Sequence, residues 1–386
     1  MAAPVHTPTA AASHALERIV NARATRNPLR IHGAGTWLTA GRPVAATTPL
    51  SLEGARGVVE YVPGDLTMTV GAATSLAEIA SVTQAERQWL ALDPAGGGSG
   101  SIGATVATNS SGPLAHAFGA PRDQVLGLEC VTGAGTVVRG GGRVVKNVAG
   151  FDLTRLMVGS WGTLGVLTEV SLRLRALPET ETTVALALPG ESAALKGTLS
   201  RLAEAHLGAF ALEMVSGALA QRIGLGDAPF LLARLGGNAD LVSAQQATLA
   251  SLGDLQKNVG PAAWTHVQSC DDGGTVVLRL SQRRSEMADS WERGSAIART
   301  CGGLVHGSPA RGIVRVALPG DPGALAAPLR AELHRFKGTV VFERLSPSLW
   351  TDLARPTALD PLSRSVKRAF DPDGILNPGI LGDPAP

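Results

Sequence analysis

Cysteines are scarce in this 386-residue chain, and long apolar runs are absent. The three cysteines, Cys130, Cys270 and Cys301, form no CxxC pair, so the sequence predicts neither a disulfide framework nor an iron–sulfur cluster bound by its own thiolates. No stretch approaches the ~18 apolar residues of a membrane-spanning helix, and the first residues lack the pattern of a secretion signal. We therefore expect a cytoplasmic protein that reaches a membrane only through partners.

Neither sign of charge is in excess. Lys plus Arg number 34 and Asp plus Glu number 32, which leaves a formal charge of +2 and argues against a nucleic-acid partner. Aromatic residues are also few, at 7 Phe, 6 Trp and 1 Tyr, whereas there are 47 glycines. So many glycines predict a fold with many tight turns, and the length allows two or three compact units.

Periodicity divides the chain into four parts and predicts an α+β fold. We expect an N-terminal helix within residues 1–27, a glycine-rich unit over 28–179, an α+β cap over 180–360, and a tail over 361–386 that begins with a helix at 361–370. Further helices are expected at 102–108 and 151–158. Strands are expected at 125–132, 275–280, 312–318 and 339–344, among others.

Two glycine loops are candidates for binding a phosphate. Residues 33–36 (GAGT) follow a predicted strand, so their backbone N–H groups can turn toward an anion, although such a loop alone more often forms only a tight turn. A formal GxGxxG at Gly98, Gly100 and Gly103 suggests a nicotinamide dinucleotide site. The preceding strand is interrupted at residues 93–94 (DP) and the following helix is short, so we reject that interpretation.

Four ordered blocks make a more specific pattern. They are GAGT at 33–36, DP at 93–94 leading to SIGATVATNSSG at 101–112, RDQVLG at 122–127, and GSWGTLGVLTE at 159–169. Together they resemble the FAD-binding domain of the vanillyl alcohol oxidase and p-cresol methylhydroxylase (PCMH) class. The stretches at 145–160 (VKNVAGFDLTRLMVGS) and 370–379 (FDPDGILNPG) narrow the resemblance to the FAD-binding E subunits of bacterial glycolate oxidase. The resemblance is dense over residues 28–178 and thin through the cap.

The resemblance implies a two-subdomain PCMH-type domain that holds FAD, followed by a cap and a tail that returns to the flavin. Backbone groups of the first loop, joined by the second, would hold the pyrophosphate, and the tail would approach the isoalloxazine ring. Some members attach FAD through a histidine where this chain has Gly35, so we expect non-covalent FAD. The implied cofactor-binding residues are His32, Gly33, Ala34, Gly35, Thr36, Pro94, Ser101, Gly103, Ala104, Thr108, Ser111, Gly112, Gly165, Val166 and Asn377.

The cap lacks the histidine-rich metal motifs that related 2-hydroxy-acid dehydrogenases share. The eight histidines are scattered, so no metal site is expected. His306 is interpreted as a solvated loop residue, with a general base as the alternative. A substrate carboxylate would favour an arginine on a cap strand. Arg279, Arg315 and Arg344 are the candidates, and each also fits a plain solvent-facing strand position. Packing against the core is the role expected for Trp161.

Three functional hypotheses remain open. The first is an FAD-binding subunit of a glycolate (2-hydroxy acid) oxidase or dehydrogenase complex, which passes electrons with a larger FAD-linked subunit and an iron–sulfur subunit. The second is a structural scaffold subunit whose FAD is idle or absent. The third is a stand-alone FAD-dependent oxidase of a small alcohol or hydroxy acid.

Overall fold

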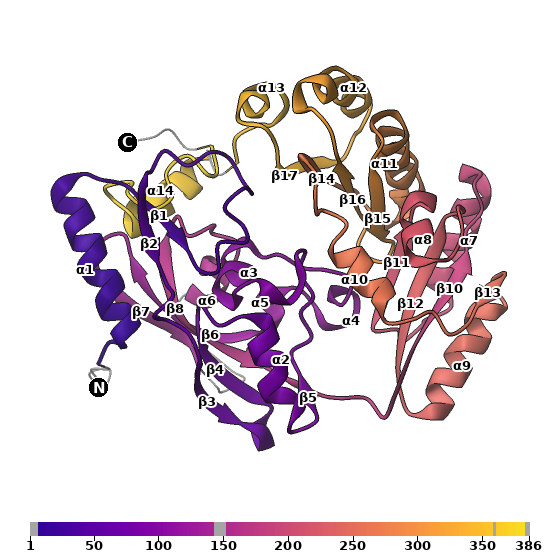
Figure 1. The fold of residues 1–386 in the computed structure, drawn as a ribbon, viewed down its shortest axis with the longest axis horizontal. Helices are drawn as coiled ribbons and strands as arrows, with labels where there is room; N and C mark the ends of the chain where they lie inside the picture. The colour runs from indigo at the N-terminus through magenta and orange to yellow at the C-terminus, as the bar shows by residue number, and fades with distance from the viewer. Residues whose placement is uncertain (1–6, 143–151, 358–359, 383–386) are drawn as a thin grey trace.

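In a computed structural model, which describes residues 7–142, 152–357 and 360–382, two α+β units lie side by side (Figure 1). The first unit contains β1 (Leu29–His32), β2 (Thr48–Ser51), β3 (Val58–Val62), β4 (Thr67–Gly71), β5 (Gln88–Trp89), β6 (Val125–Thr132), β7 (Val137–Gly141), β8 (Gly165–Arg173) and β9 (Arg175–Ala176). Its helices are α1 (Ala10–Thr25), α2 (Leu76–Gln84), α3 (Ile102–Thr108), α4 (Ala115–Phe118), α5 (Pro121–Gln124), α6 (Leu153–Met157) and, from the tail, α14 (Pro361–Phe370).

The second unit, the cap, begins with β10 (Thr180–Ala187). Its other strands are β11 (Ala211–Val215), β12 (Phe230–Gly237), β13 (Leu255–Gln256), β14 (Val276–Ser281), β15 (Leu304–Ser308), β16 (Ile313–Leu318) and β17 (Thr339–Arg344). Its helices are α7 (Ser192–Glu204), α8 (Gly217–Ile223), α9 (Ala239–Ala250), α10 (Ala262–Gln268), α11 (Met287–Cys301), α12 (Pro322–His334) and α13 (Trp350–Leu353).

The central sheet of the first unit has five strands in the order β3-β4-β8-β6-β7, all neighbouring pairs being antiparallel. Helix α1 packs on it through Ala12, Ala15, Ile19 and Ala22, which recur every three or four residues and therefore share one face. The helix begins where the Thr9 hydroxyl accepts a hydrogen bond from the N–H of Ala12. This sheet supports the loops that precede and follow its strands.

Strand β1, which pairs in parallel with β2, ends directly before the loop of residues 33–36. The tail runs alongside β1, because the N–H of Leu29 donates to Ile375 O at 2.7 Å and the N–H of Asn377 donates to Leu29 O at 3.0 Å. Residues about 350 positions apart in sequence are therefore neighbours beside the first glycine loop.

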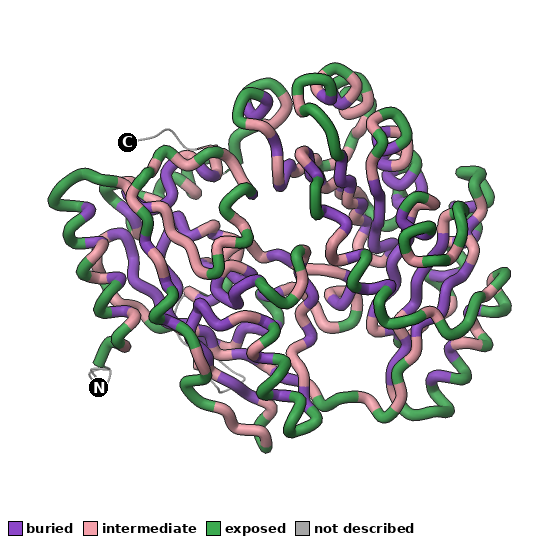
Figure 2. Tube along the Cα trace, viewed as in Figure 1, coloured by how far each residue is buried: buried purple, intermediate pink, exposed green. Residues whose placement is uncertain are grey.

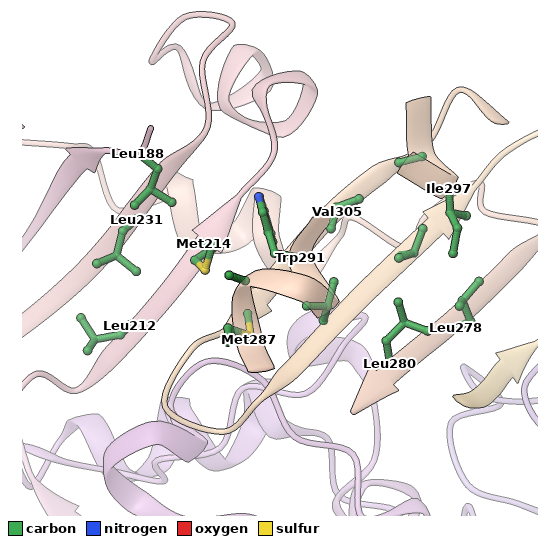
Figure 3. Packing of buried hydrophobic residues seen from close by; sticks show 14 of the residues in the cluster. Leu188, Leu212, Met214, Leu231, Leu278, Leu280, Met287, Trp291, Ile297 and Val305 are labelled. Carbon is green, nitrogen blue, oxygen red and sulfur yellow. The ribbon is translucent and has the colours of Figure 1, made fainter. Parts of the chain in front are cut away.

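The cap sheet has eight strands in the order β13-β10-β12-β11-β15-β16-β14-β17. Helices α7, α9, α11 and α12 cover one of its faces, where Met287 and Trp291 of α11 pack against strand residues such as Met214 (Figure 3). On the other face, α8 and α10 cover only part of the sheet. Figure 2 shows the strands buried and the outer helices partly exposed. The rest of that second face is available to line a site.

Many sequence-based elements are confirmed, including the strands at 125–132 and 339–344 and the helices at 102–108 and 361–370. The helix predicted from residue 151 is observed as α6, and residues 145–151 of the glycolate-oxidase-like stretch lie outside the described residues. Strands β11 and β15 and helix α12 were not predicted. Within the described ranges, no helix combines the length and apolar character that a bilayer crossing requires.

Candidate functional site

Gly33 of the first glycine loop lies directly against Ser101 of the second, and Gly103 of the second loop lies against Ala72, the residue after β4. A Cβ added to Gly33 would stand 2.4 Å from Ser101 Oγ, and one added to Gly103 would stand 2.7 Å from Ala72 O. Gly35 has φ +76°, a conformation that favours glycine. Backbone N–H groups of residues 33–36 donate no hydrogen bond to another described residue. These donors are available to an anionic ligand.

The two loops line a cleft that is open to solvent, defined here as the cofactor cleft. Ser101 adds a buried hydroxyl that has no hydrogen-bond partner among the described residues. The cleft brings together ten of the residues implied by the resemblance, namely His32, Gly33, Gly35, Thr36, Ser101, Gly103, Ala104, Thr108, Gly165 and Asn377.

Five other residues implied by the resemblance lie elsewhere. Ala34 is exposed and does not line the cleft, while Pro94 and Val166 are buried outside it. Ser111 and Gly112 line a neighbouring cavity instead. The resemblance did not distinguish the residues that line the cleft from those that pack outside it.

Asn377 holds one end of the cofactor cleft together. Its side-chain carbonyl accepts a hydrogen bond from the N–H of Ile31 at 2.9 Å, and its amide donates to Trp161 O at 2.9 Å. Asn377 has φ +41° and Trp161 has φ +54°, so both adopt the left-handed region that non-glycine residues seldom enter. The tail thus links β1 to the loop before β8.

A second cavity of about 100 Å³, defined here as the cap cavity, adjoins the cofactor cleft. Trp37, Thr108 and Trp161 line both spaces, and the two indole rings meet edge to face with centroids 5.9 Å apart. Trp161 therefore lies between the two spaces, in addition to the packing role expected from sequence. A ligand in the cap cavity would lie next to a cofactor in the cleft.

Charged residues form the cap side of this cavity. Glu213, Arg279, His306 and Arg315 alternate along their strands with apolar residues that face α11 and its neighbours, so their side chains lie on the opposite face of the sheet. His306 pairs directly with Arg315, and Arg315 pairs directly with Arg279, across β15, β16 and β14. The sheet therefore presents a row of charged groups to the first unit.

The three arginines suggested from sequence have different surroundings. The Arg315 side chain is 12% exposed, its Nε lies 2.9 Å from Asp271 Oδ2, and it also contacts Glu343. Burial opposes its charge, but the carboxylates of Glu343 and Asp271 hold the pKa of Arg315 well above its usual value. Arg344 donates to the carbonyls of Asp271 and Gly274 and does not line the cavity. Both are committed to internal partners.

Arg279 is the most available of the three. Its Nη1 lies 3.7 Å from Glu343 Oε1, which is too long for a good hydrogen bond, and its Nε is buried without a hydrogen-bond partner among the described residues. The side chain keeps 34% of its surface exposed within the cavity lining. This guanidinium can bind an anion.

Arg311 is a cavity residue that the sequence did not reveal. It follows β15 in a turn that ends at Gly312, which has φ +64°. Its guanidinium donates to Ser111 Oγ at 3.0 Å and to Gly112 O at 3.3 Å in the first unit. Burial lowers the pKa of Arg311. A single arginine in a turn has no distinguishing spacing, so only the fold shows that it bridges the two units.

The interpretation of His306 as a solvated loop residue was wrong. His306 lies in β15, is only 8% exposed, and its Nδ1 is 2.6 Å from Glu213 Oε1. Burial disfavours its charge, but Cys270 and Glu213 raise the pKa of His306 well above its usual value. The other carboxylate oxygen of Glu213 and the hydroxyl of Ser308 are buried in the cavity without partners among the described residues. Both are free to meet a polar ligand.

One buried carboxyl lies close to the cavity lining, because a Cβ added to Gly112 would stand 2.7 Å from Asp93 Oδ1. Asp93 is buried, and both of its oxygens lie 3.1 Å from the N–H of Leu114. Burial raises the pKa of Asp93 to about 7.

Among residues 7–142, 152–357 and 360–382, no group of three or more His, Cys, Asp or Glu side chains could hold a metal ion.

Comparison with known proteins supports a flavin site at this position. Residues 9–141 match the family model of the FAD binding domain. The chain is 42% identical over 164 residues to glycolate oxidase subunit GlcE of Escherichia coli. This match covers 42% of this chain and 47% of that protein. It is 30% identical over 310 residues to D-2-hydroxyglutarate dehydrogenase of Xanthomonas citri pv. viticola, covering 78% of this chain and 61% of that protein.

The solved structure of p-cresol methylhydroxylase with substrate bound is similar in fold, with a TM-score of 0.73 at 14% identity over 95% of this chain and 86% of that one. The α+β, PCMH-type fold expected from sequence is thereby confirmed, as is FAD as the cofactor. The chain spans about half the length of the GlcE protein and less than two thirds of the dehydrogenase.

Proposed function

We propose that this chain, in which residues 9–141 form an FAD-binding domain, is the FAD-binding subunit of an oxidoreductase that acts on small 2-hydroxy acids such as glycolate. The observation that carries the proposal is the charged cap cavity, which shares Trp37, Thr108 and Trp161 with the cofactor cleft. A site of this kind places an anionic substrate beside a flavin.

The cofactor cleft fits FAD. A diphosphate needs several converging hydrogen-bond donors. The cleft offers the N–H groups of residues 33–36 and the Ser101 hydroxyl, none of which has a partner among the described residues. Gly35 has no side chain that could bond to a flavin, which supports non-covalent binding. When bound, FAD supplies an acceptor for the two electrons released by alcohol oxidation.

The cap cavity fits a hydroxy acid. Arg279 has an Nε without a hydrogen-bond partner among the described residues, and Arg311 in the turn between β15 and β16 also lines the cavity, so both suit the carboxylate of the substrate. The free carboxylate oxygen of Glu213 and the hydroxyl of Ser308 suit the substrate hydroxyl. Arg315 and Arg344 orient the surrounding acidic groups and the strand ends through internal bonds.

Partners form a further part of the proposal. Two relatives are named subunits of glycolate oxidase, GlcE and GlcD, and this supports a complex with a larger FAD-linked subunit. No thiolate cluster pattern occurs among Cys130, Cys270 and Cys301, so an iron–sulfur centre for onward electron transfer would belong to another subunit. Membrane association would then come through such partners.

The test is anaerobic reduction of the purified, FAD-loaded chain by glycolate, followed by visible absorbance, with and without the co-expressed larger subunit. We expect flavin bands after reconstitution and their bleaching by glycolate. A chain that binds no FAD would be a scaffold subunit. Turnover by the isolated chain at the rate of the complex would identify a stand-alone oxidase. If replacing Arg279 leaves the glycolate concentration needed for half-maximal bleaching unchanged, the substrate binds elsewhere.

A further inference from the structure

A groove of about 860 Å³ opens in the cap between α7 and the start of α11, and it shares no lining residue with the cofactor cleft. Lys196, Leu199, Ser200 and Ala203 of α7 line it. Their spacing of three, four and seven residues places them on one face of the helix, over a length of about 10 Å. The groove therefore offers a linear surface two helical turns long.

Positive charge surrounds this groove. Lys196 lies on α7, whereas Arg283 and Arg284 lie at the 3-10 turn Arg284–Glu286 that precedes α11, and all three are exposed. Within the described ranges, no carboxylate lines the groove and none forms an ion pair with these three cations. Glu204 and Glu286 are close in sequence but lie outside the lining. We call this surface the cationic groove.

The floor between the cations is apolar. Leu202, Leu212 and Met287 are buried beneath it, and Leu199 and Leu207 are half-buried at its surface. Isolated surface cations are ordinarily just solvated, but cations of two separate elements around leucine side chains form a different kind of surface. An apolar floor with charged edges suits an amphipathic segment better than a small anion.

The cationic groove also touches the loop that reaches the cap cavity. Pro309 and Ala310 line the groove, and the next residue, Arg311, donates to Ser111 and Gly112 of the first unit. An occupant of the groove would contact this loop from the outside.

We propose that the cationic groove binds an amphipathic helix of a partner protein. The apolar side of that helix lies on the leucine floor, and its Asp and Glu residues face Lys196, Arg283 and Arg284. The positive charges around the groove favour an acidic partner, and the two-turn face of α7 favours a partner segment that is helical. This inference does not depend on the identity of the substrate.

The test uses the full FAD-loaded chain and a fluorescein-labelled synthetic helix of about 15 residues with leucines at i, i+3, i+4 and i+7 and glutamates on both flanks. Fluorescence anisotropy should show saturable binding that weakens with added salt. The double variant Arg283→Glu/Arg284→Glu should weaken binding about tenfold or more. Arg222→Glu/Arg299→Glu makes the same charge change in another groove of the cap and should leave binding unchanged.

Several outcomes would overturn the proposal. They are no binding of the acidic helix, equal binding of a version with lysine flanks, or equal weakening in both double variants. Binding of phosphatidylglycerol vesicles but not of the helix would assign the groove to a membrane surface. Self-association lost in Arg283→Glu/Arg284→Glu would assign it to a second copy of this chain. None of these measurements depends on glycolate oxidation, so failure here is distinct from failure of the proposed function.

Discussion

Nδ1 of His306 lies 2.6 Å from Oε1 of Glu213, although the two residues are 93 positions apart and both are almost fully buried. They belong to adjacent strands, β15 and β11, at the centre of the cap sheet. An imidazole and a carboxylate this close share a charge-assisted hydrogen bond. The pair is a buried ionic feature on the wall of the cap cavity, and its behaviour with pH follows from its surroundings.

The contribution of His306 to stability should depend on pH. Its folded pKa is raised well above 6.5, so the stabilisation is complete below the unfolded pKa of 6.5 and is lost as the pH rises through the folded value. We expect His306→Gln to lower the free energy of unfolding more at pH 6 than at pH 9.5, measured by urea denaturation. The exposed His206→Gln variant is the control. An equal loss at both pH values would show that the imidazole is not charged in the fold.

Asp93 should make the stability of the wild-type protein fall in the same direction, with rising pH, but nearer to neutral pH. Its folded pKa of about 7 exceeds the ordinary value of 3.8, so stability is present below pH 3.8 and declines as the pH rises toward 7. Asp93→Asn keeps an acceptor for the N–H of Leu114 and removes the titration. We expect the urea midpoint of the variant, relative to wild type, to rise between pH 4 and pH 7. A constant difference would contradict the buried, protonated carboxyl.

Gly35→Ala tests the first glycine loop. Gly35 has φ +76°, where alanine costs about 1–2 kcal/mol, so the loop would favour conformations that turn its N–H groups away from the pyrophosphate. We expect the Kd for FAD to rise about 5- to 30-fold, measured by flavin fluorescence. Gly54→Ala is the matched control, because Gly54 has ordinary φ and no atom within 4 Å of an added Cβ. Unchanged FAD affinity in Gly35→Ala would remove this loop from the site.

Arg279→Gln tests the substrate carboxylate. Hydrogen bonds to charged groups contribute about 1.5–3 kcal/mol, so the KM for glycolate in the assembled enzyme should rise about 10- to 100-fold. Arg299→Gln, at the exposed end of α11, should have no effect. Steady-state kinetics with a dye acceptor measure both. If KM stays the same while FAD remains bound, Arg279 does not contact the substrate.

Ser308→Ala should change stability and binding in opposite directions. The Ser308 hydroxyl is buried without a partner among the described residues, which costs free energy in the empty protein. Alanine should therefore raise the free energy of unfolding by about 1 kcal/mol while weakening hydroxy-acid binding several-fold. Thermal denaturation without ligand and titration of the dithionite-reduced protein with glycolate measure the two effects. A loss of stability would mean that the hydroxyl is satisfied by a bound water.

Sequence patterns predicted the elements whose periodicity is regular. Helix α3 and strands β6 and β17 were located to the residue because each is bounded by turn-forming residues. Strand β15 was missed because Leu304 and Val305 are followed by histidine and glycine, and this short segment lacks alternation. Its β character comes from pairing with β11 and β16, which no local pattern encodes.

The residues that line the cofactor cleft were easier to predict from the sequence than those that line the cap cavity. Glycine loops carry their function in consecutive residues, and Gly33, Gly35 and Gly103 do line the cofactor cleft. The cap side of the cap cavity comes from five strands and a turn that are far apart in sequence. No sequence pattern therefore connects Glu213 with Arg311. The arginines suggested on strands could not be ranked without knowing that Asp271 and Glu343 hold Arg315.

The bridge that Asn377 makes between Ile31 and Trp161 has a consequence for biosynthesis. A chain emerging from the ribosome exposes the glycine loops early, but it completes the cleft only after residue 377 has been made. Until then, the N–H of Ile31 and the carbonyl of Trp161 lack their partner. Stable capture of FAD should therefore wait until residue 377 has been made and has folded back, and a nascent chain stalled before that residue should exchange the cofactor freely.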